Sequence, residues 1–188
     1  MKKYFNKFCI SLVVLFLIFP IKSYGKELEK RVLTEYLEFY GEEIAVEYDL
    51  NWNLVKAVLF LESRYDINCV THNYDKKGNV VSTDSGIGQQ NDQWLAWYGE
   101  LAGIENPDPF NPIHSIKMLC AGLNFWKEYG IREGYEGEEL TLIMINSYNT
   151  GFNGYMQHIE KHGTMDRAYS NVVLGFKVMI DEYGYILD

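Results

Sequence analysis

Apolar residues recur at helical spacing through most of the chain, and this pattern predicts a domain built almost entirely of helices. The first stripe runs from Glu27 to about Tyr48. Asp49 or Asn51 can cap a second helix. The inward face of that helix is formed by Leu54, Ala57, Val58 and Leu61. Further helices are predicted over residues 89–101, 113–129, 140–148, 152–162 and 166–183.

The helical pattern is interrupted between residues 68 and 85. Asn73–Asn79 contains Gly78 among polar residues and predicts a turn, and Val80–Thr83 has the composition of a short strand. The prolines at 107, 109 and 112 indicate an irregular connection. The expected fold class is therefore all-α (mainly α), a single domain with a short β-hairpin near residues 70–85.

The first 25 residues have the organisation of a secretory signal peptide. Lys2, Lys3 and Lys7 precede about 13 mostly apolar residues that end near Pro20, and small residues lead to Gly25. This apolar run is shorter than the roughly 20 residues of a membrane-spanning helix. We expect cleavage after Gly25, with an uncleaved N-terminal anchor as the alternative. Residues 26–188 would then form one secreted domain.

The net charge excludes several classes of partner. The full chain has a net charge of −9, and removal of residues 1–25, which contain four lysines and no acid, leaves −13. Phosphate binding depends on Lys and Arg, so nucleic acid is an unsuitable partner. Anionic lipid would not attract this surface either, so we expect no membrane binding after removal of the leader. We expect a monomer.

Two cysteines, Cys69 and Cys120, remain after the leader. In a secreted protein an even pair can form a disulfide bond, and this pair would close a loop of about 50 residues. The alternative is two buried free thiols, because free cysteine is commonly buried.

The candidate catalytic residue is Glu62, which follows the apolar residues Leu59, Phe60 and Leu61 near a helix end. Apolar surroundings and the negative end of a helix both oppose ionisation, so this carboxyl group could keep its proton near pH 7. A neutral carboxyl group of this kind can protonate a glycosidic oxygen. The polar, glycine-containing segments 84–91 and 146–151 could form a cleft around it. The alternative is a solvated residue at the edge of a helix.

Three motifs, in this order, resemble the soluble lytic transglycosylase branch of the lysozyme superfamily. Glu62-Ser63 is similar to the Glu-Ser that ends a helix in that family. Gly86-Ile-Gly-Gln-Gln-Asn91 resembles the family's Gly-Leu-Met-Gln-Ile-Asn segment. Ser147-Tyr-Asn-Thr-Gly151 resembles its Ala-Tyr-Asn-x-Gly segment. Tyr169, with Val172 and Val173 after it, is similar to its closing Tyr-x-x-x-Val pattern. The resemblance covers about residues 45–180.

The resemblance implies a lysozyme-like fold and cleavage of the bond between N-acetylmuramic acid and N-acetylglucosamine in peptidoglycan, with a 1,6-anhydro product. Glu62 would act as acid and then base, and Tyr148 would orient the acid or the substrate's acetamido group. No metal and no organic cofactor is implied. The residues implied in substrate binding are Ser63, Gly86, Gln89, Asn91, Asn149 and Gly151. Gly88 stands where the family usually has Met, which predicts a looser cleft wall.

Three other interpretations fit parts of the sequence. A hydrolytic, goose-type lysozyme would need a second carboxylate, for which Asp84 and Asp92 are the candidates. A non-catalytic glycan-binding protein could retain the same fold. His158 and His162, four residues apart, could share a helix face and bind zinc, although the sequence between them is not that of a zinc peptidase. The aromatic residues Trp94, Trp97, Trp126, Phe152 and Tyr155 could stack on sugar or simply form core.

Overall fold

The computed structural model describes residues 30–31 and 33–187, and the predicted leader at residues 1–25 lies outside them. The helices are α2 (Glu35–Glu47), α3 (Trp52–Ser63), α4 (Leu95–Leu101), α5 (Pro112–Arg132), α6 (Gly137–His162) and α7 (Ala168–Tyr183). The strands β2 (Val70–Tyr74), β3 (Val80–Ser85) and β4 (Gln90–Asn91) form an antiparallel sheet, and β1 (Lys30–Arg31) pairs with β5 (Ile186–Leu187). The predicted mainly α fold with a hairpin near residues 70–85 is confirmed.

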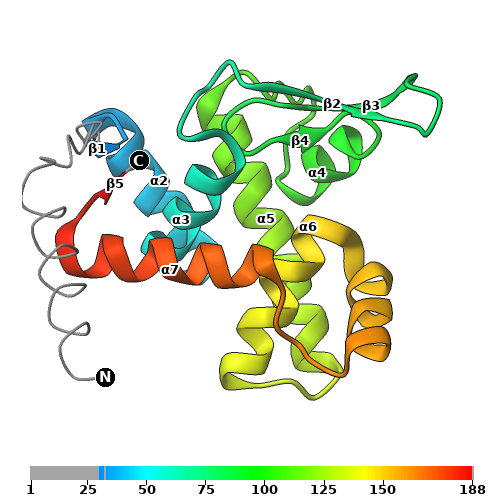
Figure 1. The fold of residues 1–188 in the computed structure, drawn as a ribbon. Helices are drawn as coiled ribbons and strands as arrows, with labels where there is room; N and C mark the ends of the chain where they lie inside the picture. Colours follow the sequence, from blue (N-terminus) through cyan, green and yellow to red (C-terminus); the bar gives the residue numbers. More distant parts are fainter. Residues whose placement is uncertain (1–29, 32, 188) are drawn as a thin grey trace, which may run out of the picture. The chain divides into compact units, whose positions relative to one another are not determined.

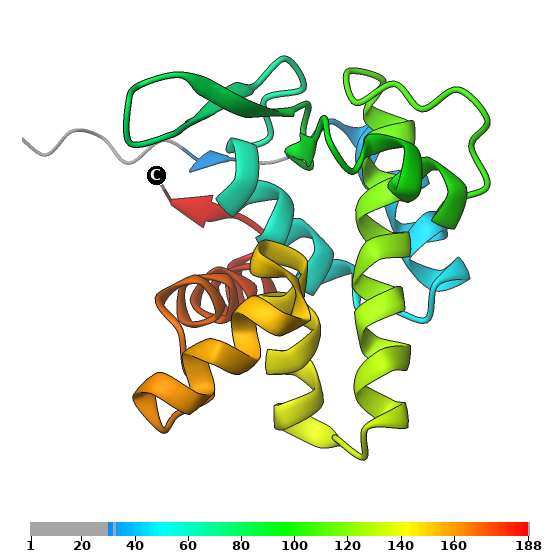
Figure 2. The ribbon, with the colours of Figure 1, turned by 90° about the vertical axis from the view of Figure 1, so that its right-hand side faces the viewer.

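The long helix α5 lies in the middle of the helical arrangement (Figures 1 and 2). It packs against α2, α3, α4 and α6, while α3 packs against α7. Leu119 and Leu123 of α5 are fully buried against Val58 and Leu59 of α3 and Ile145 of α6. Burial of each such side chain contributes about 1.5–3 kcal/mol, so this cluster holds α3 rigidly in place.

The helix α3 is apolar around nearly its whole circumference, which is typical of a helix enclosed by its neighbours. It begins where the Asn51 side chain accepts a hydrogen bond from the backbone N–H of Leu54 at 3.0 Å. It ends where Arg64 adopts a left-handed conformation and its N–H bonds to the carbonyl of Phe60. Glu62 therefore lies in the last turn of a buried helix.

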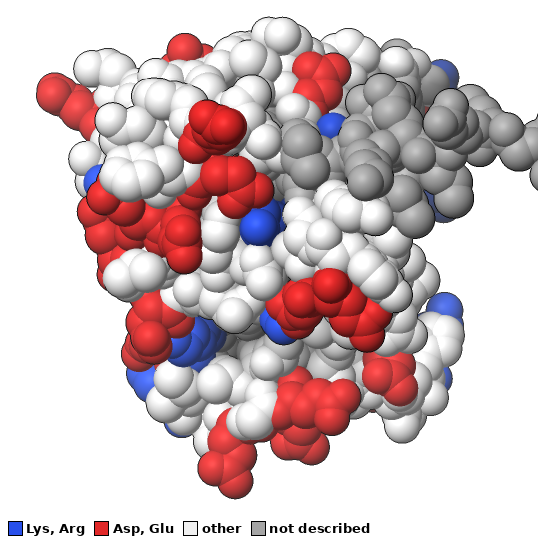
Figure 3. Space-filling model, turned by 90° about the vertical axis from the view of Figure 1, so that its left-hand side faces the viewer, with Lys and Arg blue, Asp and Glu red and all other residues white. Residues whose placement is uncertain are grey.

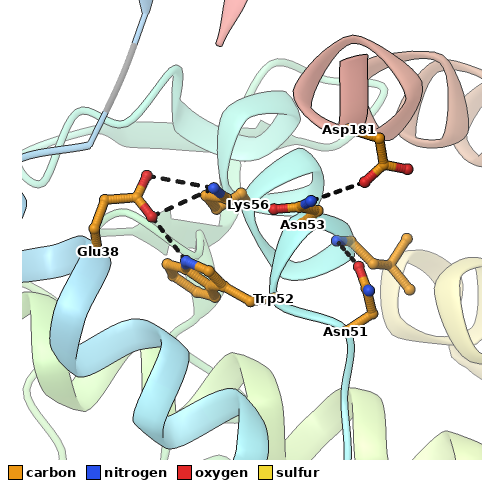
Figure 4. A network of polar contacts seen from close by, with 7 residues as sticks. Glu38, Asn51, Trp52, Asn53, Lys56 and Asp181 are labelled. Atoms are coloured by element: carbon orange, nitrogen blue, oxygen red, sulfur yellow. Dashed lines mark hydrogen bonds and ion pairs between the residues drawn. The ribbon is translucent and has the colours of Figure 1, made fainter. Parts of the chain in front are cut away.

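Polar contacts at the start of α3 join it to two other helices (Figure 4). The Trp52 indole N–H donates to Glu38 of α2 at 2.8 Å, and Lys56 forms an ion pair with the same carboxylate at 3.3 Å. On the other side, the Asn53 amide donates to Asp181 of α7 at 2.8 Å. These contacts fix the orientation of the helix that carries Glu62 in its last turn.

The β2–β3 hairpin lies beyond the C-terminal end of α3 (Figure 2). Its turn is closed by Asp75, whose N–H bonds to the carbonyl of Asn79 and whose carboxylate accepts from the N–H groups of Lys77 and Asn79. In β3, Asp84 pairs with Asn91 of β4. The sheet thus brings polar side chains of three strands onto one surface.

Several predicted boundaries were wrong. The first described helix begins at Glu35, not near Glu27, because the Thr34 side chain caps it by accepting from the N–H of Leu37. The helix predicted over 89–101 begins only at Leu95, since residues 90–91 pair as a strand. The two helices predicted at 140–148 and 152–162 are both present: they carry the single label α6, but Gly151 between them has a non-helical conformation (φ 69°, ψ 154°).

Within the described residues, no helix combines the length and the apolar character needed to cross a bilayer.

Candidate active site

A cleft of about 990 Å³ lies between the hairpin sheet and helices α3 to α6. Its sheet side carries four polar residues, Asn73, Ser82, Asp84 and Asn91. Its helical side is largely aromatic, with Trp94, Trp97, Tyr98, Phe125, Trp126, Tyr129, Tyr148 and Phe152. A surface with amide groups on one side and aromatic rings on the other suits a ligand that has both hydroxyl groups and apolar faces.

Glu62 reaches this cleft from the last turn of α3. Burial raises the pKa of its carboxyl group to about 7. The hydrogen bond from Tyr169 acts in the opposite direction, and the charge of Asp84 raises this pKa further. The carboxyl group is therefore still largely protonated just below neutral pH, the state required of a general acid.

The direct partner of Glu62 is Tyr169, at the start of α7. Its hydroxyl group donates a short hydrogen bond to Glu62 Oε1. Burial raises the pKa of Tyr169 well above its ordinary value, so this tyrosine stays a neutral donor. In the sequence, Tyr169 stood out only as part of a motif and had no assigned function, since 107 residues separate it from Glu62.

Tyr148, the predicted second catalytic residue, lines the same cleft but does not bond to Glu62. Its hydroxyl group donates to the carbonyl oxygen of Gly88 at 3.1 Å, and its ring lies 5.9 Å from that of Tyr98. It connects α6 to the 86–91 segment. A direct role of Tyr148 in the reaction stays a prediction.

The predicted substrate-binding residues fall into two groups. Gln89, Asn91, Asn149 and Gly151 line the cleft. Ser63 and Gly86 are not among the residues that line it. The Gln89 amide donates to two backbone carbonyls, those of Cys69 at 3.1 Å and Gly86 at 2.9 Å, so its side chain also supports the loop.

Ser63 and Gly86 shape the cleft from behind. The buried Ser63 hydroxyl group bonds to the carbonyl of Ile87 at 2.8 Å and ties α3 to the 86–91 segment. Gly86 has φ +76°, and a Cβ there would lie 1.7 Å from the carbonyl oxygen of Pro109. Only glycine fits this close backbone approach.

Gly88 was predicted to leave one wall of the cleft loosely packed. The space beside Gly88 is instead filled by the side chain of Gln90, a residue that was not among the predicted site residues. A Cβ on Gly88 would lie 2.3 Å from Gln90 Nε2. Gln90 is almost fully buried and bonds in both directions with Ser115, accepting from its hydroxyl group at 2.5 Å and donating to its carbonyl at 3.0 Å. A buried polar pair therefore fills the space beside Gly88. The sequence did contain a sign of this buried pair, because Gln90 is polar where the similar family motif has the apolar residue Ile.

Of the two alternatives for the cysteines, the structure has the second: Cys69 and Cys120 are both free thiols. Cys120 lies in the core on α5, and burial raises its pKa. Cys69 is half-exposed in the loop before β2, where its carbonyl accepts from Gly86 and Gln89. The two side chains belong to different environments, which the loop length alone could not reveal.

The zinc hypothesis concerned His158 and His162, whose rings lie 4.7 Å apart near the end of α6. His158 Nε2 lies 2.9 Å from the carbonyl oxygen of Asp166. Across the part of the chain that the structure describes, no group of three or more His, Cys, Asp or Glu side chains is arranged to hold a metal ion.

In a comparison with known families, the model described as the transglycosylase SLT domain matches residues 39–171. No curated protein matches the chain. The matched region begins in α2 and ends in the first turn of α7, so it includes Glu62, Tyr169 and every residue that lines the cleft.

Proposed function

The chain belongs to the transglycosylase SLT domain family, with its lysozyme-like fold, and from this premise we propose that Glu62 is the acid with which it cleaves peptidoglycan. Membership of the family gives a lytic transglycosylase-type function on peptidoglycan. The observation that carries the proposal is the raised pKa of Glu62, about 7, in a cleft large enough for saccharide units.

The first step is protonation of the leaving group. Glu62 donates its proton to the oxygen that joins N-acetylmuramic acid to N-acetylglucosamine, and the bond from that oxygen to C1 breaks. A well-placed general acid contributes about 10²–10⁴ in rate. The substrate's own 2-acetamido group stabilises the positive charge at C1, as in substrate-assisted glycosidases.

The second step returns a proton to Glu62. The carboxylate accepts the proton of the muramyl 6-hydroxyl group, and that oxygen forms the new bond to C1 to give a 1,6-anhydro end. Tyr169 supports both states of Glu62, because its hydroxyl group can donate to either the acid or the carboxylate. This sequence needs neither metal nor organic cofactor.

Substrate binding depends on short-range contacts in the cleft. The chain has more acidic than basic residues, 26 against 17, and many of the acidic side chains lie on the face of the molecule shown in Figure 3. Such a surface does not attract a wall polymer that carries carboxylates. We expect sugar rings to lie against Trp126 and Phe152, whose rings are stacked with 6.4 Å between centroids. Asn91 and Asn149 would meet the hydroxyl and acetamido groups.

The proposed site of action is the cell envelope. We propose that residues 1–25 direct export and that residues 26–188 act as a monomer on glycan strands outside the cytoplasmic membrane. Mass analysis of the N-terminus of the exported protein tests this arrangement: a mature chain beginning near residue 26 supports it, and a retained leader contradicts it.

Digestion of purified peptidoglycan, followed by mass spectrometry of the muropeptides, tests the activity. Wild-type protein should release fragments with 1,6-anhydro ends, and E62Q should release none while still binding the polymer. Fragments with reducing ends would indicate a hydrolytic, goose-type lysozyme instead. Equal fragment release by wild type and E62Q, or binding without release by both, would contradict the proposal.

A further inference from the structure

Asp84 is the second carboxyl group of the cleft, and its position is tightly fixed. One carboxylate oxygen accepts a hydrogen bond from the Asn73 amide at 2.8 Å and the other accepts from the Asn91 amide at 2.7 Å. The same two amides also donate to the Ser82 hydroxyl oxygen, at 3.1 and 3.0 Å. All four side chains line the cleft.

The register of the sheet accounts for this arrangement. Asn73 pairs with Ser82 across the hairpin, and Asp84 pairs with Asn91 on the next strand. Since Ser82 and Asp84 are two residues apart in β3, they point to the same face. The Asp84 carboxylate is thus held by neighbours on both sides, and little side-chain entropy remains to be lost when a ligand binds.

The negative charge of Asp84 has no basic neighbour in the cleft. Among the described residues that line it there is no Lys or Arg. The other carboxyl group, Glu62, is close enough for the charge of Asp84 to raise its pKa. The cleft therefore presents one fixed negative charge beside one proton donor, and it is complementary to a ligand that becomes positively charged.

Cleavage of a glycosidic bond produces such a charge, shared between C1 and the ring oxygen. We propose that Asp84 is a second functional carboxylate of this site, whose fixed negative charge stabilises the oxocarbenium-like sugar while Glu62 protonates the leaving oxygen. This inference rests on the proposed function. In this step Asp84 forms no bond and takes no proton; the amide hydrogen bonds to its two oxygens hold the carboxylate in place. Charges placed in advance where charge develops supply large parts of catalysis.

The experiment compares D84N with D92N on soluble, uncrosslinked glycan strands. Asp92 is the matched control, since it is an exposed carboxylate next to the sheet that does not line the cleft. We expect D84N to lower kcat roughly 10- to 100-fold with KM changed less than about threefold, by analogy with the loss of one preorganised charge-stabilising group. D92N should keep wild-type values.

Two further variants separate charge from structure. D84E keeps the charge and should retain several-fold more activity than D84N. The activity of D84A should rise when formate or azide, small anions that fit the space left by the carboxylate, is added. Equal losses in D84E and D84N, or no response of D84A to either anion, would overturn the proposal. Thermal unfolding and polymer binding of each variant identify any loss of activity that is caused by misfolding. If D84N is misfolded, the activities of D84E and of D84A with added anion decide whether the charge at this position is needed.

The outcomes also separate this inference from the proposed function. Wild-type cleavage that is lost in E62Q but unchanged in D84N would overturn the role of Asp84 alone. A D84N variant that turns a reducing-end product into an anhydro product would mean that Asp84 activates water, which overturns the purely electrostatic role. Cleavage that survives in E62Q would overturn the proposed function itself.

Discussion

Replacing Glu62 with Gln removes a carboxyl group whose ionisation the folded state opposes, and it should change the pH dependence of stability. Burial is the largest cause of the raised pKa, about 7 in the folded protein against an ordinary value of 4.5. This difference corresponds to about 3 kcal/mol between the two protonation states.

Whether Glu62 stabilises or destabilises the fold at a given pH depends on which state binds its proton more tightly. The folded state holds the proton of Glu62 more tightly than the unfolded chain, so this group contributes its full stability below pH 4.5. That contribution is lost as the pH rises to about 7, where the buried carboxylate must ionise. Gln cannot ionise. The free energy of unfolding of E62Q, relative to wild type, should therefore rise by about 3 kcal/mol between pH 4.5 and pH 8.

Urea unfolding followed by tryptophan fluorescence measures this difference at several pH values, since the chain contains four Trp residues. The control is N51A, which changes no ionisable group, so its difference from wild type should not change with pH. A constant difference between E62Q and wild type from pH 4.5 to pH 8 would refute the reasoning, because it would mean that Glu62 ionises equally easily in both states.

Three further predictions concern the surroundings of the acid. Y169F removes a hydrogen bond that lowers the pKa of Glu62, so the alkaline limb of the pH–rate profile should move to higher pH. G86A places a Cβ 1.7 Å from the Pro109 carbonyl oxygen at a positive φ, and thermal or urea unfolding should show a loss of about 3 kcal/mol or more. N51A removes the cap of α3 and should cost about 1 kcal/mol in the same measurement.

Two matched variants serve as controls for the losses of stability expected in G86A and N51A. G175A introduces a Cβ into open space within α7 and should leave stability unchanged or slightly higher, so equal losses in G86A and G175A would contradict the packing argument. N51D keeps an oxygen for the cap and should retain most of the stability that N51A loses. A shift of the Y169F profile to lower pH would contradict the assigned direction.

The helices could be predicted because their apolar stripes are local. Leu54, Ala57 and Val58 of the predicted inward face of α3 are buried, and Leu61 is partly buried. The predicted turn at Asn73–Asn79 was correct in part, since the turn lies between Asp75 and Asn79 while residues 73 and 74 belong to β2. Both predictions depend on residues close together in the sequence. The start of α4 could not be predicted, because Gln90 and Asn91 pair with a strand that the helical pattern of residues 94–98 does not reveal. The break in α6 at Gly151 falls in the gap that was predicted between the helices at 140–148 and 152–162.

The candidate acid was identifiable from its sequence, but its partners were not. The apolar residues before Glu62 predicted burial, and the pKa of about 7 agrees with that prediction. Tyr169 approaches Glu62 only because α7 packs against α3. Asp84 was predicted only as one of two candidates for a second carboxylate, together with Asp92. The amides of Asn73 and Asn91 that hold its carboxylate are placed by the register of the sheet. Contacts of this kind depend on tertiary packing, which local spacing does not encode.

The proposed activity requires that Glu62 keeps its proton close to neutral pH, and titration of its side-chain carboxyl carbon by ¹³C NMR measures this property. The E62Q variant identifies the signal by its loss. We predict a midpoint at about pH 7 in the folded protein. A midpoint near the ordinary value of 4.5 would contradict the account, because the carboxyl group would then have no proton to give at neutral pH.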